Sequence, residues 1–166
     1  IAVIDSRSAG SELVLLVKKI CELIESGADF ETVVEKAELY SRHTHVVFAL
    51  SSFNNLVKNG RMSKIVGFVA NKLGFWGIGI GSEQGTIEIK QKIRGSKKAL
   101  DAIIEDMKER GYNCGKVVIS HCRNAEFAES VKSAIQSVWD KAEVKIVHAR
   151  GLCSYYAEKG GLIIGF

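Results

Sequence analysis

The sequence predicts an α/β domain with a mixed sheet flanked by helices. Segments with apolar residues at helical spacing alternate with short apolar runs that are typical of strands. Residues 76–81 and 86–90 are separated by a short loop that contains Gly85, which predicts a hairpin and hence an antiparallel part of the sheet. The chain has 166 residues, of which 46% are hydrophobic and 25% charged, so we expect a single domain over residues 1–166.

The first half of the chain alternates between strand and helix. Residues 1–4 have the composition of a short buried strand, and the chain opens on them without an initiator methionine, so we expect a fragment. Apolar residues recur at helical spacing from Leu13 to Ile24, and Asp29 is suited to cap a second helix. The continuous apolar run at residues 45–50 predicts a strand that is buried on both faces.

The second half repeats this alternation. Ser96 is expected to cap a helix that extends through Met107, and Asn124 is expected to cap another. Apolar runs predict three further strands, at residues 117–119, 144–146 and 161–166. Residues 151–156 predict a turn or a short helix.

Residues 51–81 carry the most distinctive pattern. A charged loop at residues 58–64 precedes a helix with bulky side chains on more than one face, which belongs either to ordinary core or to the wall of an apolar binding site. Arg61 and Ser63 lie in this loop, and a guanidinium, a hydroxyl and the N–H groups of a helix start all suit an anion. The alternative is a surface loop with a helix cap, and the basic helix start at residues 94–98 has the same two interpretations.

Several classes of site are not supported by the sequence. The G-x-G-x-G run at residues 77–81 precedes a second strand rather than a helix, so we interpret its glycines as a bulge or a close backbone approach and not as a dinucleotide loop. The four cysteines match neither a zinc nor a redox spacing and predict reduced thiols in a cytoplasmic protein. The net charge of +4 is scattered, and no apolar run approaches the ~18 residues of a membrane span. We therefore expect no metal site, no cofactor, no nucleic-acid partner and no membrane span.

Four segments together resemble the DegV family of bacterial fatty-acid-binding proteins: residues 4–10, 56–64, 92–100 and 160–166, in family order. The resemblance implies a two-lobed α/β protein, of which this chain is similar to the C-terminal lobe, with the N-terminal lobe absent. It also implies that a long-chain fatty acid lies in an apolar tunnel of this lobe. The protein would have no catalytic residues and would present the fatty acid to a separate fatty acid kinase for phospholipid synthesis.

The resemblance also implies roles for particular residues. Arg61 matches an arginine linked to the kinase, and with Ser63 and Tyr156 it is expected near the tunnel mouth. Tyr156 stands where the family often has a histidine, and Glu158 stands at a family glycine. A tyrosine still donates a hydrogen bond but is neutral at pH 7, so the possible positive charge is lost. The expected tunnel residues are Phe53, Leu56, Ile65, Phe68, Val69 and Leu73.

Two other classes of function stay open at this point. One is a small-molecule phosphotransferase that uses the loops of Arg61 and Arg94, for which the sequence offers neither an acidic metal cluster nor a phosphate-binding glycine loop. The other is a DNA-binding regulator, which the unclustered charge disfavours.

Overall fold

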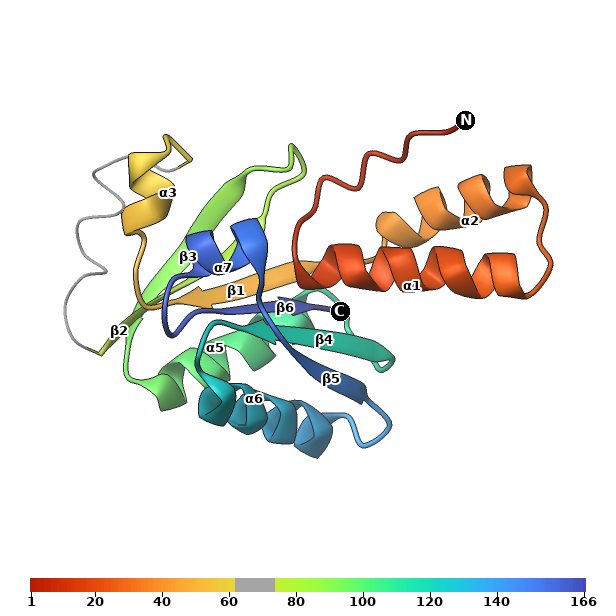
Figure 1. The fold of residues 1–166 in the computed structure, drawn as a ribbon. Coiled ribbons are helices and arrows are strands. Elements are labelled where there is room, and N and C mark those ends of the chain that lie inside the picture. Colours follow the sequence, from red (N-terminus) through yellow and green to blue (C-terminus); the bar gives the residue numbers. More distant parts are fainter. Residues whose placement is uncertain (62–73) are drawn as a thin grey trace.

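A six-stranded sheet forms the centre of the computed structural model, which describes residues 1–61 and 74–166 (Figure 1). The strand order is β3-β2-β1-β6-β4-β5. Strands β4 and β5 are parallel and the other neighbouring pairs are antiparallel, which confirms the predicted mixed sheet. The strands are β1 (Val46–Leu50), β2 (Phe75–Gly81), β3 (Ile87–Arg94), β4 (Lys116–His121), β5 (Glu143–His148) and β6 (Leu162–Gly165).

Helices cover both faces of this sheet. Figure 1 shows α5 (Ser96–Glu109) and α6 (Ala125–Val138) below the sheet, where both pack on its strands. On the opposite face α1 packs on β4 and β6, α2 packs on α1, and α3 packs on α7. These helices are α1 (Ser11–Glu25), α2 (Phe30–Ser41), α3 (Asn54–Lys58) and α7 (Gly151–Ala157). No described helix is both long and apolar enough to cross a membrane.

Strand β1 contributes to a core on each face, because alternate side chains of a strand point in opposite directions. Val47 and Ala49 lie in the larger core under α5 and α6. Phe48 and Leu50 lie in a smaller cluster with Leu56 of α3. The strand is therefore buried on both faces, as its continuous apolar run predicts.

The glycines of β2 make room for aromatic rings on the face of the smaller cluster. A Cβ atom at Gly77 would lie 2.1 Å from Cζ of Phe53, and one at Gly79 would lie 2.4 Å from Cε2 of Phe48. The register between β2 and β3 also shifts next to Gly79, as in a β-bulge. The close-approach interpretation of the glycine run is thus confirmed, whereas the extra residue at the register shift is Lys90 on β3 and not one of the glycines.

Residues 1–4 differ from the sequence prediction, because they form no strand. Ile1 and Val3 are highly exposed, and no described strand pairs with this segment. An extended segment without a neighbour has no ladder of backbone hydrogen bonds to hold it, so apolar composition alone does not make it a strand.

The predicted N-cap positions are confirmed at Asp29 and Asn124 and are wrong at Ser96. Asp29 caps α2, since its Oδ1 accepts from the backbone N of Thr32 at 2.8 Å. Ser96 is the first residue of α5, and the N-cap position is held by the preceding glycine with φ 93°. Asn124 is the N-cap residue of α6, but its side chain makes no cap hydrogen bond, and its Nδ2 donates to the backbone oxygen of Gly160 at 2.8 Å.

Candidate functional site

A largely apolar cavity of about 470 Å³ lies on the face of the sheet that carries α3 and α7. Its floor is made by Phe48 and Leu50 of β1 and Ile163 of β6. Leu56 of α3 and Tyr156 of α7 form neighbouring parts of its wall. Elements that are far apart in the sequence thus converge on one hollow, and most of the side chains they bring to it are apolar.

The turn after α3 places Arg61 at this cavity. Gly60 adopts φ 66°, a conformation that glycine tolerates best, and its N donates to the backbone oxygen of Val57 at 3.1 Å. The N of Arg61 donates to the oxygen of Leu56 at 2.9 Å. This pair of bonds is the Schellman arrangement that ends many helices. It explains why a glycine precedes the arginine in the charged loop.

The opposite rim is made by the N-terminal segment, through Arg7, Ser8 and Ala9. Nη1 of Arg7 donates to the backbone oxygen of Glu83 in the β2–β3 turn at 2.9 Å. Arg7 itself has a positive φ of 48°. Arg7 and Arg61 thus bring positive charge to the cavity, and no described lining residue is an aspartate or a glutamate. An anionic group would meet no like charge in the described lining.

A buried carboxylate, Glu12 in the first turn of α1, holds this N-terminal segment. Its side chain is buried, with Oε1 accepting from Oγ1 of Thr44 at 2.9 Å and Oε2 accepting from Oγ of Ser8 at 2.5 Å. Burial raises the pKa of Glu12, and the two hydrogen bonds oppose that shift. Since Ser8 lines the cavity, Glu12 links the rim of the site to the start of α1.

The raised pKa of Glu12 predicts a pH-dependent stability. The group favours folding fully below its unfolded pKa of about 4.5, and this contribution is lost as pH rises through the higher folded pKa. Glu12→Gln cannot ionise, so the difference between its free energy of unfolding and that of the wild type should shift in favour of the variant as the pH rises above about 4.5. Urea unfolding of both proteins at each pH measures the difference. A difference that stays constant over this range would contradict the assignment.

The structure brings together three of the residues expected at the site. Arg61, Tyr156 and Leu56 all line the cavity. Phe53 is buried but does not line it, because its ring packs over Gly77 instead. The remaining expected residues, Ser63, Ile65, Phe68, Val69 and Leu73, lie outside the described residues.

Other lining residues were missed by sequence reasoning, among them Phe48, Leu50 and Ile163. They belong to strands that are apolar on both faces, so the sequence shows no difference between the side chains that face the core and those that face a cavity. Arg7 was missed because its segment was interpreted as a turn before a helix.

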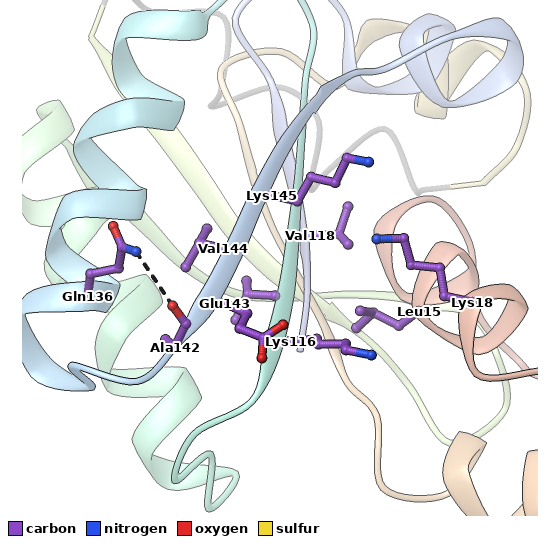
Figure 2. A pocket seen from close by; sticks show the side chains of 10 residues that line it. Leu15, Lys18, Lys116, Val118, Gln136, Ala142, Glu143, Val144 and Lys145 are labelled. Atoms are coloured by element: carbon purple, nitrogen blue, oxygen red, sulfur yellow. Dashed lines mark hydrogen bonds between the residues drawn. The ribbon is translucent and has the colours of Figure 1, made fainter. Parts of the chain in front are cut away.

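A second cavity of about 420 Å³ lies at the edge strand β5 (Figure 2). Lys18, Lys116 and Lys145 line it together with Glu143. Lys116 also forms an ion pair with Glu22 of α1. Exposed lysines and carboxylates of this kind are normally solvated. This cavity is therefore a poor match for an apolar ligand.

Two histidines meet at the carboxyl ends of the parallel strands. The ring centroids of His121 and His148 are 4.5 Å apart, and Nδ1 of His121 accepts from the backbone N of Asn124 at 3.1 Å. Burial, and then the neighbouring His148, lower the pKa of His121. In the described part of the chain no group of three histidine, cysteine, aspartate or glutamate residues is placed to hold a metal ion.

Comparisons with known proteins agree with this fold. A family model described as "Uncharacterised protein, DegV family" matches residues 1–166. A DegV domain-containing protein from Streptococcus pyogenes serotype M1 is 44% identical over 166 residues, which is 100% of this chain and 59% of that protein.

Two solved structures are similar over nearly the whole chain. The Streptococcus pneumoniae Fatty Acid Kinase (Fak) B3 protein loaded with linoleic acid has a TM-score of 0.97 at 43% identity, covering 100% of this chain and 59% of its own. A DegV family protein from Eubacterium eligens loaded with heptadecanoic acid has a TM-score of 0.96 at 37% identity, covering 98% of this chain and 59% of its own. The chain thus spans about 59% of the length of these relatives.

Proposed function

Because the chain belongs to the DegV family, we propose that it binds the hydrocarbon tail of a long-chain fatty acid in the cavity between β1, β6, α3 and α7. The observation that carries the proposal is the lining, in which Phe48, Leu50, Leu56 and Ile163 present apolar side chains to one hollow. Two structural neighbours, with 43% and 37% identity, are described as loaded with linoleic and heptadecanoic acid.

The affinity would come mainly from the tail. Burying a methylene group contributes about 0.8 kcal/mol, so a tail of ~14 methylenes contributes up to roughly 11 kcal/mol before the cost of ordering it. The carboxylate needs hydrogen-bond donors or positive charge to offset its lost hydration. Arg7 and the Tyr156 phenol line the same cavity and can serve it.

We propose that the protein acts as a carrier and not as an enzyme, and that it presents the fatty acid to a separate fatty acid kinase. The exposed Arg61 at the rim suits contact with such a partner, because exposed charges mainly guide association. The same proposal places the protein in the cytoplasm, a reducing compartment that suits its four free cysteines.

Arg61→Ala is expected to separate the two roles. It should leave fatty-acid affinity within about 3-fold of the wild type and slow kinase-dependent phosphorylation of the bound fatty acid by about 10-fold, because a rim charge affects partner association more than burial of the tail. The measurement is acyl phosphate formation by the kinase at increasing concentrations of the full-length carrier. Lys58→Ala, one turn earlier and also exposed, is the matched control. Equal rates for Arg61→Ala and wild type would argue against the partner contact.

Mass spectrometry of the organic extract of the purified full-length protein tests the main proposal. A long-chain fatty acid at near-stoichiometric amount is the expected result. No fatty acid in the extract, together with no binding when one is added, would overturn it. Turnover of ATP by the protein alone would instead favour the phosphotransferase. The structure gives that alternative little support, since Arg94 lies over the ring of Phe75 and is not among the described lining residues.

A further inference from the structure

Glu158, at the end of α7, holds an unfavourable backbone conformation. Its φ is 53°, in the left-handed region that a residue with a Cβ atom rarely adopts. It is followed by the turn that leads into β6. A non-glycine residue persists in this conformation only where its surroundings hold it there.

The side chain of Glu158 makes contacts that account for this. Oε1 accepts from the backbone N of Asn55 at 2.9 Å, and Oε2 accepts from Oγ of Ser52 at 2.6 Å. Asn55 is in the first turn of α3, whose own N-cap residue, Phe53, makes no side-chain cap. A carboxylate from about 100 positions later in the chain therefore supplies a second acceptor to the start of α3, where Oγ of Ser52 accepts from the backbone N of Asn54 at 3.4 Å.

Further hydrogen bonds join the same two segments. Nδ2 of Asn55 donates to the backbone oxygen of Tyr155 at 2.8 Å, and Nδ2 of Asn59 donates to the Tyr155 hydroxyl at 3.0 Å. Oγ of Ser51 donates to the backbone oxygen of Lys159 at 3.2 Å. Of these bonds, the two made by Glu158 combine a charged acceptor with short distances, so they are expected to be the strongest.

The joined segments lie side by side, and both contribute to the wall of the cavity. One segment carries Leu56 and Arg61, and the other carries Tyr156, and all three line the cavity. Glu158 itself is not among the described lining residues, and both of its oxygens accept hydrogen bonds from the α3 segment. It is therefore placed to hold the walls and not to contact the ligand.

We propose that Glu158 is a positioning residue that holds α3 and α7 together at the wall of the cavity and so controls how fast a bound fatty acid leaves. The inference rests on the proposed function. When the carboxylate is lost, the bonds to Asn55 and Ser52 are lost with it, and the two segments separate more readily. The cavity opens more often, and the ligand dissociates faster.

The test compares Glu158→Ala, Glu158→Gln and Glu158→Gly in the full-length protein. Dissociation of cis-parinaric acid, a fluorescent long-chain fatty acid, is measured after mixing with excess unlabelled oleic acid. Glu158→Ala is expected to dissociate about 10-fold faster than wild type, and Glu158→Gln should lie between them because its amide oxygen replaces one of the two acceptors. Glu158→Gly relieves the backbone conformation, so it should unfold at a higher temperature than Glu158→Ala while releasing ligand just as fast.

Two controls separate this role from general stability and from the proposed function. Glu129→Ala removes an exposed carboxylate on α6, across the sheet, and should dissociate at the wild-type rate. A Glu158→Ala protein that is folded and dissociates within 2-fold of wild type would overturn the inference. If wild type binds no fatty acid, the proposed function fails. Amide hydrogen exchange then tests whether Glu158 holds α3. The Asn55 N–H should exchange faster in Glu158→Ala than in Glu129→Ala, and equal exchange in the two variants would refute this positioning role.

Discussion

Replacing Ile163 with aspartate is expected to weaken fatty-acid binding by at least about 100-fold, which corresponds to about 2.7 kcal/mol. Ile163 lies on the cavity floor and is partly buried, so in the unliganded protein a carboxylate there keeps contact with water. A bound tail would displace that water and leave the charge in an apolar lining. The cost of such burial exceeds the gain from several methylenes.

The matched variants are Ile163→Asn and Ile163→Val. The asparagine has nearly the shape of aspartate without its charge, so it should lose clearly less affinity, and the valine should bind within a few-fold of wild type. Isothermal titration with oleic acid measures all three, with circular dichroism as the check on folding. A folded Ile163→Asp protein that binds like Ile163→Asn would show that the tail does not pass over β6.

Gly77→Val is expected to lower the free energy of unfolding by about 3 kcal/mol or more. The new Cβ would lie 2.1 Å and 2.5 Å from atoms of the Phe53 ring, which is almost completely buried. The ring cannot move to water without opening the cluster, so either it or β2 must shift. Urea unfolding measures the change, and Ile80→Val on the opposite face of β2 is the control, with an expected cost of about 1 kcal/mol.

A second substitution tests whether Phe53 is the cause. Phe53→Ala removes the ring that a side chain at Gly77 would strike, so the two changes together should cost clearly less than the sum of the single ones. Additive costs, or a Gly77→Val protein as stable as the control, would mean that the clash is relieved elsewhere.

The arrangement of elements could be predicted from the sequence because it depends on local patterns. Helical spacing from Leu13 to Ile24, the Asp29 cap and the hairpin around Gly85 each reflect contacts within a few residues. The strand predicted at residues 1–4 was wrong, because a strand forms only where a neighbouring strand pairs with it, whatever its own composition. The cap at Ser96 was wrong because a capping residue type does not fix the residue at which a helix begins, and the N-cap Asn124 makes no cap bond because its side chain turns to Gly160.

The site could be predicted only in part, since it is built from contacts across the chain. The glycine at position 60 indicates that the helix ends just before Arg61. Nothing in the local sequence indicates that Ile163 and Phe48 lie together on the floor of the cavity. Glu158 shows most clearly which part of the site could be predicted and which could not. Its positive φ accounts physically for the family glycine that the resemblance places there, yet its hydrogen bonds to Ser52 and Asn55 could not be inferred without the fold.

The lysines around the cavity at β5 have a further consequence for how the protein meets other chains. An edge strand exposes unpaired backbone N–H and C=O groups that can pair with a strand of another chain. Lysine side chains on the edge strand commonly prevent this pairing. Lys145 occupies one outer edge of the sheet, and Lys90 and Lys92 occupy the other, on β3. Sheet extension and fibril-like stacking are therefore disfavoured at both ends. A protein partner is therefore expected to contact side chains and not to pair with an edge strand. The rim of the cavity at Arg61 offers side chains for such a contact.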